Sequence, residues 1–359
     1  MAGEKTTTPI SMNGGDGRYS YTHNSSLQRN GVELMKAMIN EAIAEKLDLV
    51  QLSSPNSFRI ADLGCSVGPN TFTAVQNIID SITLKCQTSY RSSEEANNLE
   101  FQVFFNDQIS NDFNTLFKNL PSDRKYSAAG VPGPFQGRLF AKNSLHFVHS
   151  SYALHWLSSV PRELVDEDSL AFNKGRIHYS SSPKHVLKAY SAQFGIDTTS
   201  FLNARAQEVV HGGLMGILIL CSPDGVPCSL CNVLAVYELL GASVVDLAKK
   251  ALISEAKVDN FNLPMYNPTE KELKELIEKN GCFSIERMEP IIHERRFNIP
   301  MIIFHMRASL EGMISEHFGK NIVDQLFDLF AKKVVDSRIY SESSSYQAMV
   351  QLFVLLKRA

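Results

Sequence analysis

The sequence predicts an α/β fold in which a mostly parallel, doubly wound sheet carries a helical cap. Short apolar runs typical of buried strands alternate with segments of helical periodicity, and this alternation is characteristic of parallel sheets. The first run breaks into a glycine-rich turn before a helix, and the next run ends in an acidic residue. Two later stretches, near 228–281 and 302–338, are largely helical, so we interpret them as a cap over the sheet.

The individual elements follow from the spacing of apolar side chains along the chain. Residues 31–49 place apolar groups at helical intervals, and residues 71–86 follow the first strand as a helix. The predicted strands start near Ser57 and then occupy 99–107, 145–154, 214–221, 282–291 and 349–358. We divide the chain into a core at 1–227 with an N-terminal arm, a helical cap segment at 228–281, and a region at 282–359 that holds the late strands of the sheet and a second cap segment.

Composition excludes several classes of partner. The 359 residues carry a formal net charge of -3, with 44% hydrophobic and 20% charged residues, which is ordinary for a globular enzyme. Without a basic excess, neither nucleic acid nor an anionic membrane is an expected partner. The N-terminus lacks the apolar segment of a secretory signal, so we expect a cytoplasmic protein whose six cysteines are reduced. The pair Cys228 and Cys231 lacks the two further ligands that a zinc site needs nearby.

The strongest local signal is the segment ADLGCSVGPN. Asp62, Gly64 and Gly68 follow a strand and precede a helix, where glycines let a ligand approach the backbone closely. The acid–x–Gly turn suits the zwitterionic tail of an amino acid, with Asp62 near its ammonium group. Asp107 ends the next strand, where an acid accepts hydrogen bonds from ribose hydroxyls. The alternatives are that Asp62 caps a helix and Asp107 lies in a turn, or that the site serves an NAD-dependent oxidoreductase or a sensor without turnover.

Motifs along nearly the whole chain carry a family resemblance. The segments SMNGGDGRYSYTHNSSLQ, ADLGCSVGPNTF, FQVFFNDQISNDFNTLF, LHFVHSSYALHWLS and RAQEVVHGGLM resemble the SABATH methyltransferases of plant specialised metabolism. The resemblance implies a Rossmann-like class I methyltransferase core with a helical cap and a substrate-covering arm, commonly as a homodimer. It also implies transfer of a methyl group from S-adenosylmethionine to the carboxylate of a small acid. One branch of the family instead methylates ring nitrogens of xanthine alkaloids, which remains the alternative.

The resemblance also assigns residues by position. The cofactor contacts that it implies are Tyr21, Ser25, Gly64, Cys65, Asn70, Asp107, Gln108 and Phe135. Asp62, from the turn itself, and Pro134, through its backbone, complete the expected cofactor site. The expected substrate contacts are Gln28, Tyr152, His155, Trp156, Tyr237, Tyr266, Met306 and Ser309. Two cofactor positions depart from the family pattern, because Pro134 replaces a usual serine and Gln108 stands where leucine is common. We expect cofactor binding to survive both departures.

The chemistry of carboxylate methylation makes Gln28, Trp156 and His155 the catalytic candidates. A carboxylate is ionised at neutral pH and needs no general base, so the enzyme must supply alignment. The indole N–H of Trp156 and the amide of Gln28 are donors that can hold one oxygen of the carboxylate. Taken alone, Trp156 would be interpreted as a core aromatic residue. His155 is a candidate partner for a substrate hydroxyl, carbonyl or carboxylate oxygen.

A divalent ion is a further expectation from the resemblance. Asn173, Asp259, the carbonyl of Phe261 and Asn262 match positions that hold a metal in some family members. All four ligands are oxygen atoms, which suits Mg²⁺ in a structural role. The alternative is a polar turn at the end of a helix.

Overall fold

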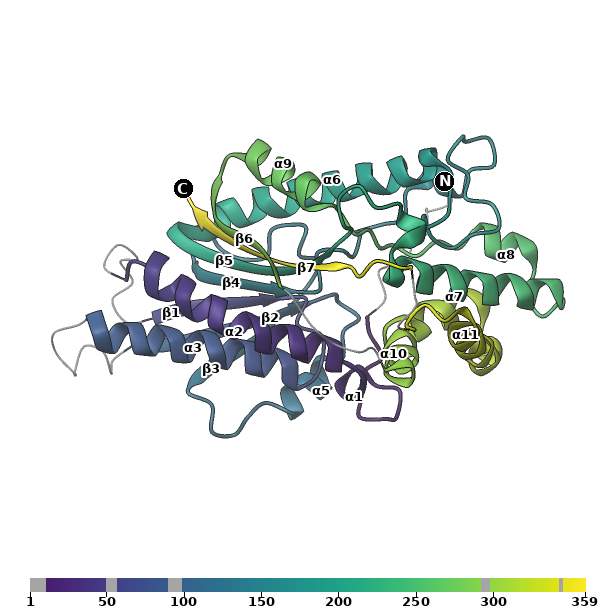
Figure 1. The fold of residues 1–359 in the computed structure, drawn as a ribbon. Helices are drawn as coiled ribbons and strands as arrows, with labels where there is room; N and C mark the ends of the chain where they lie inside the picture. The colour runs from purple at the N-terminus through teal and green to yellow at the C-terminus, as the bar shows by residue number, and fades with distance from the viewer. Residues whose placement is uncertain (1–10, 50–56, 90–98, 292–297, 342–344) are drawn as a thin grey trace, which may run out of the picture.

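A seven-stranded sheet forms the centre of the protein (Figure 1). The computed structural model describes residues 11–49, 57–89, 99–291, 298–341 and 345–359. The strands are β1 (Ser57–Leu63), β2 (Glu100–Asp107), β3 (Tyr126–Pro132), β4 (Leu145–Ser151), β5 (Val209–Cys221), β6 (Phe283–Ile291) and β7 (Val350–Arg358). They run in the order β3-β2-β1-β4-β5-β7-β6. β7 pairs antiparallel with both β5 and β6, and the other neighbouring pairs are parallel. The α/β fold class predicted from the sequence is confirmed.

Helices cover both faces of the sheet, because successive side chains of each buried strand point to opposite faces. On β5, Ile217 belongs to one apolar core and Leu218 to the other. The core around Leu218 is closed by α2 (Ser26–Lys46) and α3 (Pro69–Ser89), which pack side by side. The core around Ile217 is closed by α6 (Lys184–Glu208) and α9 (Glu270–Asn280).

The cap consists of helices grouped at one end of the sheet (Figure 1). Its long helices are α7 (Asn232–Lys249), α10 (Ile299–Phe318) and α11 (Val323–Ser337), which pack on one another, with the short α8 (Glu255–Asp259) beside α7. The remaining short helices are α1 (Tyr21–Asn24), α5 (Phe113–Lys118), η1 (Arg162–Leu164), η2 (Cys228–Leu230) and η3 (Lys320–Ile322). The predicted cap segment 228–281 therefore includes α9, a helix that the structure packs against α6 of the core.

Local chemistry explains where the helices around the site begin and end. The side chain of Asn298 accepts a hydrogen bond from the Met301 amide at the start of α10, and a proline lies in its first turn. Thr269 caps α9 in the same way, and Gly281 ends that helix at φ 68°. In the described part of the chain, no helix is both long and apolar enough to cross a membrane.

Candidate active site

The turn after β1 has the backbone that the glycine pattern predicts. Gly64 and Gly68 have φ values of 79° and 107°, and Ser66 between them has φ 52°. A Cβ atom on Gly64 would collide with the side chain of Ala153, so a larger residue does not fit. The amides of Gly64 and Cys65 both donate to the carbonyl of Asn106 at 2.9 Å, which ties this turn to β2.

Asp107 lies at the carboxyl end of β2, against the same turn. One carboxylate oxygen accepts the Ser66 amide at 2.6 Å and the other accepts the Gln108 amide at 2.7 Å. Burial raises the pKa of Asp107 to about 6, although the two amide bonds act in the opposite direction. The group is therefore mainly ionised at pH 7, and each oxygen keeps a lone pair for a ribose hydroxyl. The buried hydroxyl of Ser66 has no partner among the described residues, so it can form a hydrogen bond with a bound nucleoside.

Asp62 is enclosed and already paired within the protein. Its Oδ1 lies 2.7 Å from Nδ1 of His149 on β4, and its Oδ2 accepts the hydroxyl of Thr71 on α3. The residue is 3% exposed. These contacts hold β1, β4 and α3 together below the turn. The expected contact of Asp62 with an ammonium group stays a prediction.

The other predicted cofactor residues surround the same edge. Asn70 at the start of α3 donates to both the hydroxyl and the carbonyl of Ser25, at 2.9 and 3.0 Å. The pKa of Tyr21 is raised by burial and by the nearby charge of Asp107. Phe135 is buried, whereas Pro134 is exposed. In open parallel sheets, ligands bind at this carboxyl edge of the strands.

A second feature is a cavity of about 130 Å³ between the core and the cap. It is lined by seven of the eight predicted substrate residues, which are Gln28, Tyr152, His155, Trp156, Tyr237, Met306 and Ser309. They come from α2, the loop after β4, α7 and α10. Tyr266 does not line this cavity, and its hydroxyl donates instead to Glu272 at 2.8 Å. Tyr21 lines the cavity too. The cavity therefore adjoins the carboxyl edge of β1 and β2 with Asp107, which we call the cofactor edge.

The loop after β4 is fixed by backbone contacts with the segment before α9. The amide of Tyr266 donates to the carbonyl of His155 at 2.9 Å, and Trp156 forms an isolated bridge with Met265. The indole N–H of Trp156 has no hydrogen-bond partner among the described residues, and its ring lines the cavity. Trp156 therefore borders the space in which a substrate fits.

Sequence patterns missed several polar residues of the cavity wall. His305 on α10 places Nε2 3.3 Å from Nε2 of Gln28. Gln351 on β7 accepts the hydroxyl of Tyr152 at 2.8 Å. Asn232 and Tyr340 also line the cavity. These residues lie far apart in the sequence, and no local motif marks them.

Burial keeps the histidines of the cavity neutral. Desolvation lowers the pKa of His155 to about 4, and it also lowers the pKa of His305. Nδ1 of His155 and Oε1 of Gln28 are buried without a partner among the described residues. The cavity therefore offers neutral donors and acceptors, which can recognise hydroxyl, carbonyl and carboxylate groups.

Two of the predicted metal ligands, Asn173 and Asn262, are bonded to each other. The amide of Asn173 donates to Oδ1 of Asn262 at 2.6 Å, and Asn173 Oδ1 accepts from Ser182 at 2.8 Å. Asp259 accepts the amide of Gly175 at 2.7 Å. Among the described residues, no group of three or more His, Cys, Asp and Glu side chains could hold a metal ion.

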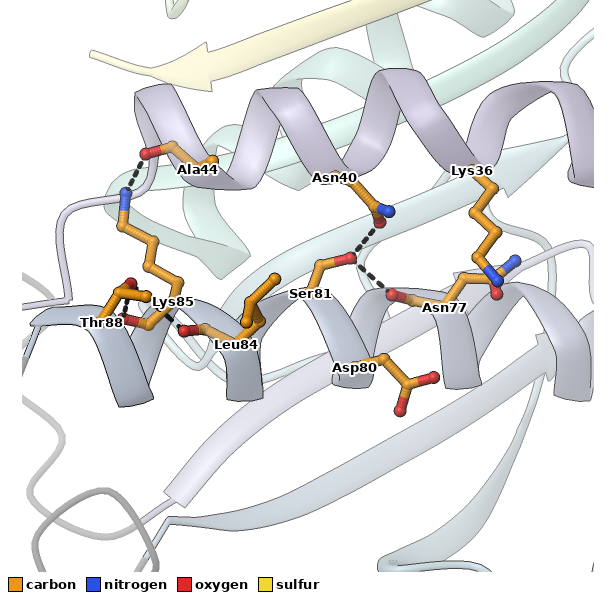
Figure 2. A pocket seen from close by; sticks show the side chains of 9 residues that line it. All are labelled: Lys36, Asn40, Ala44, Asn77, Asp80, Ser81, Leu84, Lys85 and Thr88. Carbon is orange, nitrogen blue, oxygen red and sulfur yellow. Dashed lines mark hydrogen bonds between the residues drawn. The ribbon is translucent and has the colours of Figure 1, made fainter. Parts of the chain in front are cut away.

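A larger groove of about 430 Å³ lies between α2 and α3 (Figure 2). Its polar side chains bind neighbouring groups of the same two helices. Lys85 donates to the carbonyls of Ile43 and Ala44 at 2.9 and 2.6 Å, and Ser81 bonds to Asn40 and to the carbonyl of Asn77. These contacts stabilise the end and packing of α2, and nothing in them indicates catalysis.

The buried histidines predict a loss of stability in mild acid. Folding lowers the pKa of His146 and His155 to about 4 and that of His178 to about 3, so these groups stay neutral in the folded protein. The unfolded chain takes up protons near pH 6.5, so the free energy of unfolding should fall as pH drops from about 6.5 towards 4. The raised pKa of Asp107 has the opposite effect on stability between about pH 6 and 4, but it is one group against three histidines.

Urea denaturation at pH 7, 6 and 5 measures this effect. Each histidine contributes at most about 1.4 kcal/mol per pH unit. His146→Asn is a suitable variant, because the asparagine oxygen can still accept the Arg59 amide that Nδ1 of His146 accepts at 2.9 Å. It should weaken the pH dependence, and equal stability at pH 7 and 5 would contradict the expectation.

The fold and the adjoining sites define a class of protein. A mostly parallel sheet carries a glycine turn and a buried aspartate at its carboxyl edge, beside a cavity between the core and the cap. Over residues 7–359, the chain matches the sequence family described as SAM dependent carboxyl methyltransferase. It therefore belongs to the S-adenosylmethionine-dependent carboxyl methyltransferases, the SABATH family, as the sequence motifs predicted.

Individual relatives match over nearly their full length. The chain is 47% identical to the loganic acid O-methyltransferase of Catharanthus roseus, with 97% of this chain and 94% of the relative covered. It is 42% identical to the farnesoic acid carboxyl-O-methyltransferase of Arabidopsis thaliana, with 98% and 99% covered. A solved structure of loganic acid methyltransferase with SAH superposes with a TM-score of 0.92 and 46% identity, with 97% of this chain and 98% of that chain covered. The protein is an S-adenosylmethionine-dependent carboxyl methyltransferase, and the oxidoreductase alternative is set aside.

Proposed function

We propose that this enzyme esterifies a small acid that carries further hydroxyl or carbonyl groups, such as an iridoid acid. The observation that carries the proposal is the set of polar side chains within the mostly apolar lining of the cavity. Asn232, Tyr237 and Ser309 line it together with the two cavity histidines, and Nδ1 of His155 is buried without a partner among the described residues. A wholly apolar acid would leave buried donors and acceptors unpaired, at a cost of about 1–3 kcal/mol each. The similarity to the loganic acid enzyme supports the same substrate class.

Within the cavity, the carboxylate would be held by Gln28 and Trp156. Both line the cavity, and the indole N–H of Trp156 is unused within the described residues. Donors that bind one carboxylate oxygen leave the other free to attack, aligned at roughly 3 Å. When bound, S-adenosylmethionine supplies an electrophilic methyl group on its sulfonium. The buried carboxylate of Asp107 and the unpaired hydroxyl of Ser66 fit its ribose.

His155 would recognise a polar group of the substrate. Its neutral ring offers one donor and one acceptor, and Nδ1 is buried without a partner among the described residues. A histidine with a pKa of about 4 is a poor general base at pH 7. This suits a reaction in which the nucleophile is already ionised.

A panel of acids tests the proposal. Labelled-methyl assays should give a higher kcat/KM for acids with hydroxyl groups than for matched acids without them. His155→Ala should reduce this preference, because the substrate hydroxyl loses a partner worth about 1 kcal/mol. A tenfold preference of the wild type for the bare apolar acid would refute the proposed substrate class. Methyl transfer to a xanthine, with every acid rejected, would refute carboxylate methylation by this chain.

Two further expectations come from the family resemblance. The proximity of Asn173, Asp259 and Asn262 supports a structural Mg²⁺ site with oxygen ligands. Binding would require Oδ1 of Asn262 to exchange the hydrogen bond that it accepts from Asn173 for the ion. A homodimer is the expected assembly, as in the family.

A further inference from the structure

Gln28 is not free to turn within the cavity, because its amide is bonded to the cap helix α10. Nε2 of Gln28 lies 3.3 Å from Nε2 of His305, and Nδ1 of His305 lies 3.1 Å from the carbonyl oxygen of Asn24. We propose that His305 is a positioning residue, which fixes the orientation of the Gln28 amide so that it holds the substrate carboxylate. The inference rests on the proposed methylation of a carboxylate.

The hydrogen positions follow from the partner of each ring nitrogen. A carbonyl oxygen only accepts, so the bond to Asn24 requires the proton to be on Nδ1 of His305. The ring is neutral, since burial lowers the pKa of His305. Nε2 therefore carries a lone pair, and the contact requires Gln28 to donate an N–H to it. The alternative amide orientation would bring two acceptors together.

This assignment determines what Gln28 presents to a substrate. One amide hydrogen is used by His305, and the second remains for a carboxylate oxygen. Without His305, the amide can rotate by half a turn and place Oε1 against the carboxylate, which is repulsive. Oε1 is buried without a partner among the described residues, so no other contact in the described structure holds the orientation.

The contact also joins separate parts of the fold at one point. His305 lies on α10 of the cap, Gln28 lies on α2 of the core, and Asn24 ends the short helix α1. Tyr21 on α1 has its ring 6.3 Å from that of His305, so the cofactor edge is adjacent. The orientation of the Gln28 amide, the proposed donor to the carboxylate, therefore depends on how the cap packs against the core.

Two substitutions separate the two bonds of His305. In His305→Asn, the side-chain amide can still donate to Asn24 but is too short to reach Gln28. In His305→Gln, the longer side chain can place its oxygen near the former Nε2 and accept from Gln28. We expect His305→Asn to lower kcat/KM for the acid about tenfold, the cost of one misplaced hydrogen bond. His305→Gln should stay within about threefold of the wild type, and the KM for S-adenosylmethionine should be unchanged in both.

A double-mutant cycle with Gln28→Ala completes the test. If His305 acts through Gln28, His305→Asn should cause no further loss in the Gln28→Ala background. Wild-type kcat/KM in His305→Asn, or an equal additional loss in both backgrounds, would overturn the positioning role and leave the proposed function intact. Failure of the wild type to esterify any acid would instead refute both. A uniform loss of folding and cofactor affinity in both variants would show a merely structural role and also overturn the proposal.

Discussion

Asp107→Ala should lower the affinity for S-adenosylmethionine by at least about a hundredfold. The carboxylate of Asp107 is fixed by two backbone amides, so both oxygens are aimed before the ligand arrives. Two hydrogen bonds from ribose hydroxyls to a charged group contribute about 1.5–3 kcal/mol each, and about 2.7 kcal/mol already corresponds to a hundredfold change in Kd. Calorimetric titration with S-adenosylmethionine measures the loss directly.

Controls separate this effect from damage to the fold. Asp123→Ala removes an exposed carboxylate of similar size and should leave binding unchanged. Asp107→Asn keeps one acceptor oxygen and should fall between the wild type and Asp107→Ala. Asp107→Ala also leaves the amides of Ser66 and Gln108 without this acceptor, so urea denaturation should accompany the titration to show that the variant is folded. Wild-type affinity in a folded Asp107→Ala protein would exclude this residue from the cofactor site.

The cofactor edge was predictable because its signals are local in the sequence. The run that becomes β1 is followed at once by Gly64 and Gly68, and the run that becomes β2 ends at Asp107. Parallel pairing of β1 with β2 then brings these features together without any further information. The resemblance to a family supplied Gln28 and Trp156 as candidate substrate residues, which composition and spacing alone did not indicate.

The features that sequence analysis missed depend on tertiary contacts. β3 was not predicted, because its segment YSAAGVP is short, rich in small residues and only partly buried at the edge of the sheet. The helix α9 was assigned to the cap, since nothing local shows that its apolar side packs on α6. His305 and Gln351 reach the cavity from α10 and β7, and only the assembled fold places them beside Gln28 and Tyr152.

A buried ion pair at the end of α6 holds the loop that carries Phe135. Arg205 and Glu208 are fully buried, and their nitrogen and oxygen atoms lie 2.6 Å apart. Arg205 donates to the carbonyls of Phe135 and Gly137, both at 2.9 Å. Oε1 of Glu208 accepts the amides of Leu139 and Phe140, at 2.5 and 2.8 Å. The pair therefore supplies partners for four backbone groups beside the cofactor edge.

Arg205→Met should lower the free energy of unfolding by about 3–5 kcal/mol, because Glu208 would remain buried as an uncompensated charge and two loop carbonyls would lose their donor. Urea denaturation measures this loss. Lys271→Met is the matched control, since Lys271 and Glu275 form an exposed pair at 4.0 Å that contributes little.

The double variant Arg205→Met with Glu208→Leu removes the unpaired charge of Glu208, yet it leaves all four loop groups unpaired. If the pair serves the loop, this double variant should remain destabilised and bind S-adenosylmethionine more weakly, because Phe135 is no longer held. Recovery of both stability and cofactor affinity in the double variant would show that the loop keeps its position without the pair.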